Sequence, residues 1–164
     1  MPNVIIAGTP KCGTTSLYHY LSDHPEVCTS RCGETRYLID KNKPFYTSER
    51  NFSVQGMEGY RRLFDHCDPD RQKVIVDVTP DYMYQKTPLR VLLTITPVPK
   101  IVFILRNPAM RTYSLYQFAR NNIGLIDKNM SFKTFIENIE ASATRNEENR
   151  IILYDECEKS KYIN

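Results

Sequence analysis

Several features that define special classes of protein are missing from the 164 residues of this chain. No apolar run approaches the roughly 20 residues that a membrane-spanning helix needs. The first residues, Met1-Pro2-Asn3, lead straight into the apolar stretch 4–7 without a basic region or a cleavage site, so no signal peptide is expected. There is no tryptophan, no internal repeat and no low-complexity tract. The chain as given is therefore expected to be cytoplasmic.

Neither positive nor negative charge dominates the sequence. Lysine and arginine number 22 against 19 aspartates and glutamates, which gives a formal charge of +3. This imbalance is too small to argue for a nucleic-acid partner. With 41% hydrophobic and 25% charged residues the composition is that of a globular protein, and the length suits a single domain over residues 1–164.

The five cysteines do not complete a metal site. Cys28 and Cys32 are spaced C-x-x-x-C, but no second pair supplies the remaining ligands of a zinc site. The spacing leaves two interpretations open, a disulfide between these two residues or free thiols in a reducing compartment. From the sequence alone we favour the free thiols.

Strands and helices alternate along the chain, which predicts an α/β fold with a parallel sheet flanked by helices. The apolar runs 4–7, 73–77 and 100–105 are typical of buried strands. Helices are expected over 14–22, 57–64, 87–97, 107–120 and from 131, whereas 26–55 shows no regular pattern. On the first helix, Leu17, Tyr20 and Leu21 have the spacing of a buried face. Such sheets bind ligands at the carboxyl ends of their strands, so the loops after Ala7 and Leu105 are the candidate site.

The loop after the first strand has the composition of a phosphate-binding loop. Gly8 and Gly13 are spaced G-x-x-x-x-G between a strand and a helix, where backbone N–H groups can face an anion. An ATP-binding P-loop would continue with Lys and then Ser or Thr. Here Thr14 and Thr15 follow, and the lysine lies inside the loop at Lys11. Taken alone, the loop fits either a different anion arrangement or a plain glycine-rich turn.

The second loop carries an arginine and a serine. Arg106 directly follows the clearest strand, and Asn107-Pro108 predicts the start of a helix that contains Ser114. Arg106 can make charge-assisted hydrogen bonds to a phosphate oxygen, and the Ser114 hydroxyl can add another donor. Taken alone, Arg106 would more simply pair with a surface carboxylate.

Together the two segments resemble the sulfotransferases that use 3′-phosphoadenosine-5′-phosphosulfate (PAPS). The run 10–17, P-K-C-G-T-T-S-L, is similar to the family's 5′-phosphosulfate-binding loop, P-K-x-G-T-T-x-L. The run 105–116, L-R-N-P-A-M-R-T-Y-S-L-Y, is similar to its 3′-phosphate-binding segment, L-R-[DN]-P-x-x-R-x-x-S-x-Y. The resemblance spans residues 3–122 and implies a P-loop NTPase-like sulfotransferase fold. It is nearest to the membrane-type carbohydrate enzymes and their bacterial relatives.

The resemblance implies a role for each matching residue. Lys11 would contact the phosphosulfate and stabilise charge on the bridging oxygen, while Arg106 and Ser114 would hold the 3′-phosphate of PAPS or of its product, PAP. In the carbohydrate branch a glutamate in K-E-P-x-x-F or K-E-T-x-x-F is the general base, and Glu34 in G-E-T-R-Y-L takes that place. The implied cradle for the phosphosulfate comprises Lys11, Cys12, Gly13, Thr14, Thr15 and Ser16.

The implied reaction is transfer of a sulfuryl group from PAPS to a carbohydrate or small-molecule acceptor, at a hydroxyl or, less readily, an amine. No metal is required, and no nucleic-acid partner is expected. The chain would lie in the Golgi lumen if it belongs to a longer eukaryotic protein. Neither the acceptor nor the oligomeric state can be predicted from the sequence.

Three departures from the family pattern stand out. Val78 replaces the lysine that heparan-type members carry in E-K-[ST]-x-x-Y, and Gly33 replaces the lysine that often precedes the glutamate. A later family segment, G-x-Y-x-x-x-L-x-x-W, is matched only at its beginning, by Ser160-Lys161-Tyr162. The domain is therefore expected to be incomplete at its C-terminus.

Two alternatives remain from the sequence. The run 74–77, V-I-V-D, is similar to an apolar strand that ends in a Mg²⁺-binding aspartate, Asp77, as in a small P-loop kinase. The missing Gly-Lys-[Ser/Thr] argues against that alternative. The other alternative, suggested by the short domain, is a PAPS- or PAP-binding module without activity.

Overall fold

The computed structural model describes residues 1–41 and 43–142, and the chain divides into two compact units. The first unit comprises Met1–Leu105, and the second begins at Arg106. The partial family segment at Ser160-Lys161-Tyr162 lies outside the described residues. Among the helices of the described ranges, none combines the length and the apolar character of a membrane span.

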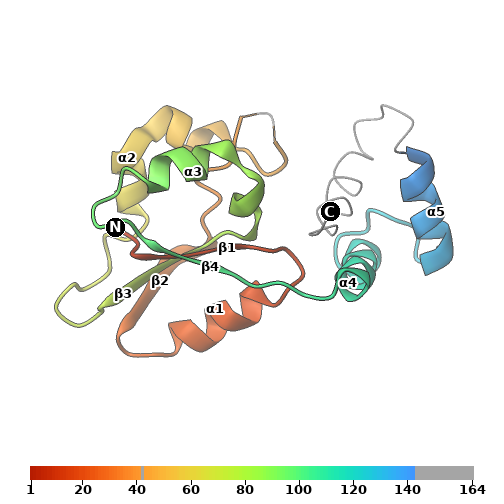
Figure 1. Ribbon diagram of the computed structural model, residues 1–164, viewed down its shortest axis with the longest axis horizontal. Coiled ribbons are helices and arrows are strands. Elements are labelled where there is room, and N and C mark those ends of the chain that lie inside the picture. The colour runs from red at the N-terminus through yellow and green to blue at the C-terminus, as the bar shows by residue number, and fades with distance from the viewer. Residues whose placement is uncertain (42, 143–164) are drawn as a thin grey trace. The chain divides into compact units, whose positions relative to one another are not determined.

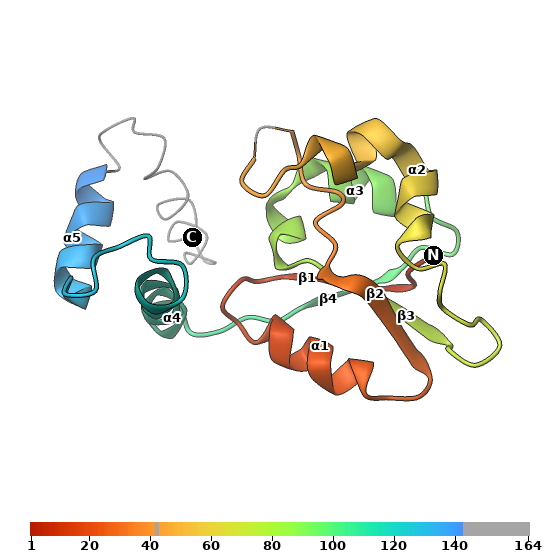
Figure 2. The same ribbon diagram turned by 180° about the vertical axis from the view of Figure 1, so that it is seen from behind.

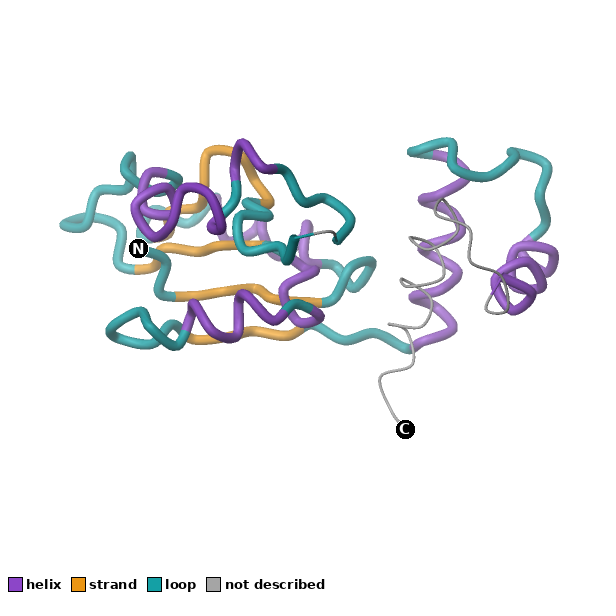
Figure 3. The backbone as a smooth tube through the Cα atoms, turned by 90° about the horizontal axis from the view of Figure 1, so that it is seen from above, coloured by secondary structure: helices purple, strands orange, loops and turns teal. Residues whose placement is uncertain are grey.

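A parallel sheet forms the centre of the first unit and confirms the predicted α/β fold (Figures 1 and 3). Its four strands lie in the order β2-β3-β1-β4. Ile5 of β1 pairs with Asp77 of β3 on one side and with Ile101 of β4 on the other. The strands are β1 (Val4–Gly8), β2 (Val27–Glu34), β3 (Val74–Val78) and β4 (Lys100–Phe103). Because every pair is parallel, all four carboxyl ends lie at one edge.

Helices cover both faces of this sheet (Figures 1 and 2). Helix α1 (Thr14–Ser22) lies on one face, and α2 (Phe52–Arg62) and α3 (Lys86–Leu92) lie on the other. Successive strand residues point to opposite faces, so Ile6 belongs to the core cluster that α1 covers and Ile5 to the cluster under α2 and α3. Two short 3-10 turns, η1 (Ser48–Arg50) and η2 (Pro80–Tyr84), complete the unit.

The face of α1 differs from the prediction by one residue. Leu17 and Leu21 pack against the core as expected, and Tyr18 accompanies them. Tyr20 is 76% exposed instead. The turn of the helix therefore presents Tyr18 to the sheet, where its hydroxyl accepts a hydrogen bond from Thr29.

The prediction of an irregular segment over 26–55 is wrong, because β2 lies within it. Its sequence, V-C-T-S-R-C-G-E, is mostly polar and has no apolar run that would indicate a strand. The strand β2 lies at the edge of the sheet. Among the described strands it pairs only with β3, so no strand lies on its other side. Helix α3 also begins earlier than expected, at Lys86, with Gln85 rather than Thr87 at the cap position.

The cysteines pair differently from both interpretations of the sequence. A disulfide joins Cys28 of β2 to Cys67, which follows α2, and Cys32 remains a thiol. The bridge spans 39 positions of the chain, and in the chain-entropy model a loop of that length stabilises the folded state by roughly 4 kcal/mol. The spacing of Cys28 and Cys32 was misleading because the sheet brings a distant residue to β2. His66 lies beside the bridge, with Nε2 3.5 Å from the Cys28 sulfur.

The second unit is built from α4 (Pro108–Asn121) and α5 (Phe132–Ser142). The predicted helix start is confirmed, because the Asn107 side chain accepts a hydrogen bond from the Met110 N–H at 3.2 Å. The helices meet through aromatic rings, and the Tyr116 hydroxyl donates to the Met130 carbonyl at 2.6 Å. The rings in contact belong to Tyr113, Tyr116, Phe132 and Phe135.

A buried carboxylate lies in the core of the first unit. Asp77 of β3 has no exposed surface, and burial raises its pKa to about 6. Hydroxyl groups surround it and favour its ionised form: Tyr60 donates to Oδ2 at 2.5 Å, and Thr35 donates to both oxygens at 2.9 and 3.0 Å. Burial and the neighbouring carboxylate raise the pKa of Tyr60 well above its usual value, so this phenol stays protonated and donates.

The raised pKa makes stability depend on pH. The folded-state pKa of Asp77 lies above the unfolded value of 3.8, so its contribution is full below pH 3.8 and is lost as pH rises through 6. Between pH 4 and pH 7.5 the wild type should lose roughly 2 to 3 kcal/mol of unfolding free energy relative to Asp77→Asn. Urea unfolding of both proteins across this range measures the difference, and a difference independent of pH would contradict the assignment.

Candidate active site

The loop between β1 and α1 is held by a turn of its own and by a hydrogen bond to the segment after β4. The Cys12 N–H donates to the Thr9 carbonyl at 3.1 Å, which closes a turn inside the loop. The Thr9 N–H donates in turn to the carbonyl of Ile104, just beyond β4, at 3.0 Å. Gly8 lies against the side chain of Met83 in η2, which would have to move to admit a Cβ at this position.

The end of this loop is shaped for an anion. Gly13 has a φ of 95°, in the left-handed region that glycine adopts without strain, and it directly precedes α1. The Leu17 N–H donates to the Gly13 carbonyl at 3.0 Å and begins the helical hydrogen bonding. The N–H groups before Leu17 have no helical acceptor and carry the positive end of the helix dipole. Thr15 and Ser16 are exposed there, whereas Thr14 is buried.

Lys11 also occupies the left-handed region, with a φ of 66°. For a residue other than glycine this backbone conformation is strained, and such strain is concentrated at functional sites. Its side chain is half-buried, and burial lowers the pKa of the ammonium group. The carboxylate of Glu34 opposes that shift by electrostatic attraction. The charge of Glu34 therefore acts on Lys11, although Lys11 lies on the β1–α1 loop and Glu34 on β2.

Glu34 is the last residue of β2 and pairs in register with Val78 of β3. Its carboxylate accepts two hydrogen bonds from the Arg36 guanidinium, from Nη2 at 2.8 Å and from Nε at 3.2 Å. About a third of each side chain is exposed, 32% for Glu34 and 38% for Arg36. The two hydrogen bonds thus hold the Glu34 carboxylate in one orientation, and the ion pair stays open to solvent at the carboxyl edge of the sheet.

Arg36, which no sequence motif singles out, is the partner of the candidate base Glu34. Its guanidinium stacks over the ring of Phe45, 4.2 Å from the centroid. Both residues have positive φ values, 51° for Arg36 and 67° for Phe45. Its position two residues after the candidate base was the available signal, because the turn after β2 brings both side chains together.

Asp77 does not present a ligand for Mg²⁺. Its carboxylate is fully buried, and hydroxyl groups of Thr35, Tyr60 and Thr79 occupy its oxygens. A kinase-type aspartate has to reach a metal ion on the nucleotide. The geometry therefore removes the main residue on which the kinase alternative depended.

The second unit contains the residues expected at the 3′-phosphate. Arg106 is exposed and directly precedes the Asn107 cap of α4. Ser114 is half-buried and lies about two turns into that helix. Arg111, on the same helix, is buried and 1% exposed. The roles of Arg106 and Ser114 stay predictions.

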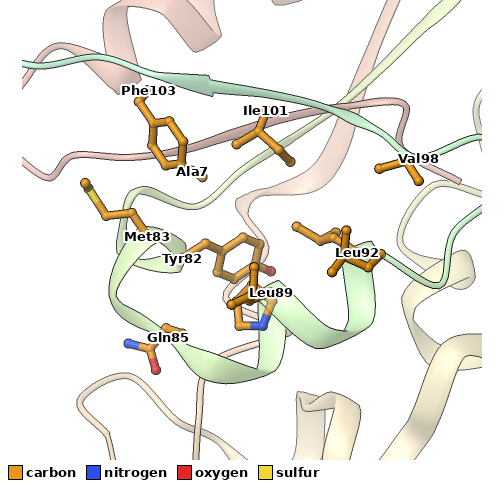
Figure 4. A pocket seen from close by; sticks show the side chains of 11 residues that line it. Ala7, Tyr82, Met83, Gln85, Leu89, Leu92, Val98, Ile101 and Phe103 are labelled. Carbon is orange, nitrogen blue, oxygen red and sulfur yellow. The ribbon is translucent and has the colours of Figure 1, made fainter.

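A pocket of about 210 Å³ in the first unit has a different character (Figure 4). Ile101 and Phe103 of β4 form one wall, and Leu89 and Leu92 of α3 form another. No charged side chain lines this pocket, so it does not suit a phosphate or sulfate group.

Comparison with known proteins agrees with this geometry. The family model for the sulfotransferase domain matches residues 1–148, across both units. The membrane-associated sulfotransferase kil1 of Dictyostelium discoideum is 30% identical over 120 residues, which are 73% of this chain and 23% of that protein. The bifunctional heparan sulfate N-deacetylase/N-sulfotransferase 1 of Caenorhabditis briggsae is 31% identical over 117 residues, 71% of this chain and 13% of that protein.

A solved structure agrees in fold. The crystal structure of a sulfotransferase from Alicyclobacillus acidocaldarius superposes with a TM-score of 0.72 at 24% identity, covering 96% of this chain and 63% of that one. The chain thus spans less than two thirds of that structure and less than a quarter of the two curated relatives. The family match over residues 1–148 shows that this chain belongs to the sulfotransferase domain family.

Proposed function

We propose that this chain transfers a sulfuryl group from PAPS to an acceptor on a carbohydrate or a small molecule. The observation that carries the proposal is the β1–α1 loop, where Gly13 at a φ of 95° directly precedes α1 and leaves Thr15 and Ser16 exposed at the carboxyl edge of the sheet. The names of the heparan sulfate N-deacetylase/N-sulfotransferase relatives support a carbohydrate acceptor. A hydroxyl is the expected acceptor group, and an amine is the second choice.

The β1–α1 loop fits the phosphosulfate end of PAPS. It offers the cationic Lys11, the N–H groups at the start of α1 and the hydroxyls of Thr15 and Ser16. The cradle that we propose consists of Lys11, Cys12, Gly13, Thr14, Thr15 and Ser16. When bound, PAPS would supply the activated sulfuryl group. Arg106 and Ser114 are proposed to hold the 3′-phosphate, which distinguishes PAPS and PAP from ADP.

Two side chains divide the chemistry between them. The Lys11 ammonium stabilises negative charge on the leaving side, as the bond from sulfur to the bridging oxygen breaks. The Glu34 carboxylate accepts the proton of the acceptor group as the new bond to sulfur forms. Arg36 holds Glu34 in place before the acceptor arrives. Positioning and charge stabilisation account for this reaction without a metal ion.

The disulfide supports one of the two expected locations. Structural disulfides form and persist in oxidising compartments and are rare in the cytosol. The Cys28–Cys67 bridge therefore favours a lumenal site of folding over a cytoplasmic one. We propose the secretory lumen, the location expected for a part of a longer eukaryotic protein.

Replacement of Lys11 tests the leaving-side role. Lys11→Ala should lower kcat for sulfuryl transfer by about 100- to 1000-fold, because removing one such donor has an effect of that size elsewhere. Release of PAP from PAPS, measured with heparan sulfate, chondroitin sulfate and p-nitrophenol as acceptors, reports the rate. Lys11→Arg is the matched control, since it keeps the charge and should retain more activity. An unchanged kcat in Lys11→Ala would refute the role.

Replacement of Arg106 tests the proposed 3′-phosphate contact. Arg106→Ala should weaken PAP binding by about 10- to 100-fold, because one charge-assisted contact is removed. It should leave the affinity for adenosine 5′-phosphosulfate, which has no 3′-phosphate, unchanged. Calorimetric titration measures both affinities, with the exposed Arg90→Ala as a control on α3. Equal PAP affinity in the wild type and in Arg106→Ala would contradict the assignment.

A further inference from the structure

We infer that Asp77 is a positioning residue, whose buried carboxylate holds the turn that carries Glu34 and Arg36 through the hydroxyl of Thr35. This inference rests on the proposed function, because it takes Glu34 as the general base. Neither Asp77 nor Thr35 can contact the acceptor, since both side chains are 0% exposed.

The contact between Thr35 and Asp77 is close and shielded from solvent. The Thr35 hydroxyl lies 2.9 Å from Oδ1 and 3.0 Å from Oδ2 of Asp77, so its proton is shared between the two oxygens. Thr35 stands directly between Glu34 and Arg36 in the sequence. Fixing its side chain therefore fixes the backbone on which both charged side chains are mounted.

The same cluster of hydroxyls holds the backbone of the turn directly. The Thr79 hydroxyl accepts from the Arg36 N–H at 3.1 Å and lies 3.3 Å from Asp77 Oδ1, to which it donates. The Tyr82 hydroxyl accepts from the Leu38 N–H at 3.2 Å and lies 2.8 Å from the Thr35 hydroxyl. The turn 34–38 is thus tied to β3 and η2 by a network that has the Asp77 carboxylate at its centre.

Two considerations indicate that this network positions the turn 34–38. A carboxylate in a core is less favourable than an apolar side chain of similar size unless its partners compensate for the lost hydration. The turn also holds Arg36 at a φ of 51°, which persists only where the surroundings over-determine it. The network supplies that constraint, and it fixes the backbone from which Glu34 and Arg36 meet in their ion pair.

Substitutions at Thr35 and Tyr60 separate the role of the Thr35 hydroxyl from that of another hydroxyl bound to Asp77. Thr35→Val keeps the branched shape and removes the hydroxyl, and it should lower kcat for sulfuryl transfer by about 10- to 100-fold without changing KM for PAPS. Thr35→Ser restores the hydroxyl and should stay within threefold of the wild type. Tyr60→Phe is the matched control: it removes a hydrogen bond to Asp77 that comes from α2 rather than from the turn, and kcat should stay within threefold.

A double-mutant cycle tests whether Thr35 acts through Glu34. In the Glu34→Gln background, Thr35→Val should reduce kcat by less than twofold further, because the base that it positions is already lost. A full and independent loss in that background would overturn the inference. So would a Tyr60→Phe effect on kcat as large as that of Thr35→Val, since the role would then be general stability of the core.

Amide hydrogen exchange tests the tether without turnover. In Thr35→Val the amides of Arg36 and Leu38 should exchange at least tenfold faster, while the amide of Ile6 in β1 keeps its protection. Unchanged protection at both turn amides would overturn the inference. If they lose protection while the wild type transfers no sulfuryl group to any of the acceptors, the tether stands and the proposed function fails.

Discussion

The parallel pairing of β1 with β3, continued by β2 on the far side of β3, is the constraint on which the rest of the structure depends. Because every strand runs in the same direction, the loop after β1 and the end of β2 emerge at one edge of the sheet. Ile6 and Glu34 both pair with Val78, so they lie at the same level with one strand between them. Burial lowers the pKa of Lys11 on the loop after β1, and the Glu34 carboxylate opposes that shift.

The charges at this edge have a consistent physical arrangement. Lys11 is a half-buried cation on the β1–α1 loop, and the Glu34 carboxylate of β2 opposes the lowering of its pKa by burial. Arg36 orients that carboxylate from within its own turn. Beneath them, the hydroxyl groups around Asp77 connect the turn to the core. Rigid support of this kind allows a reaction to proceed by positioning and electrostatics, which is the chemistry expected of a group transfer without a metal.

The parts of the fold that follow from local signals were predictable, and the parts that depend on distant contacts were not. Strands β1, β3 and β4 are apolar runs, and Asn107 caps α4 as its sequence indicates. The polar edge strand β2 lacks such a signal, and the disulfide joins residues that only the sheet brings together. The roles of Lys11 and Glu34 were predicted from their motifs and stay predictions. The hydrogen bond that Tyr60 of α2 donates to Asp77 joins residues that no local pattern connects.

We propose that this chain binds a nucleotide bearing a 3′-phosphate and a 5′-phosphate at the β1–α1 loop. Thermal unfolding with adenosine 3′,5′-bisphosphate, beside ADP and ATP–Mg²⁺, tests it most directly. A ligand at about 100 times its Kd adds roughly 2.7 kcal/mol, which raises Tm by several degrees. We expect such a rise with the 3′,5′-bisphosphate and a much smaller one with ADP. Stabilisation by ATP–Mg²⁺ alone, or equal stabilisation by ADP and the 3′,5′-bisphosphate, would contradict it.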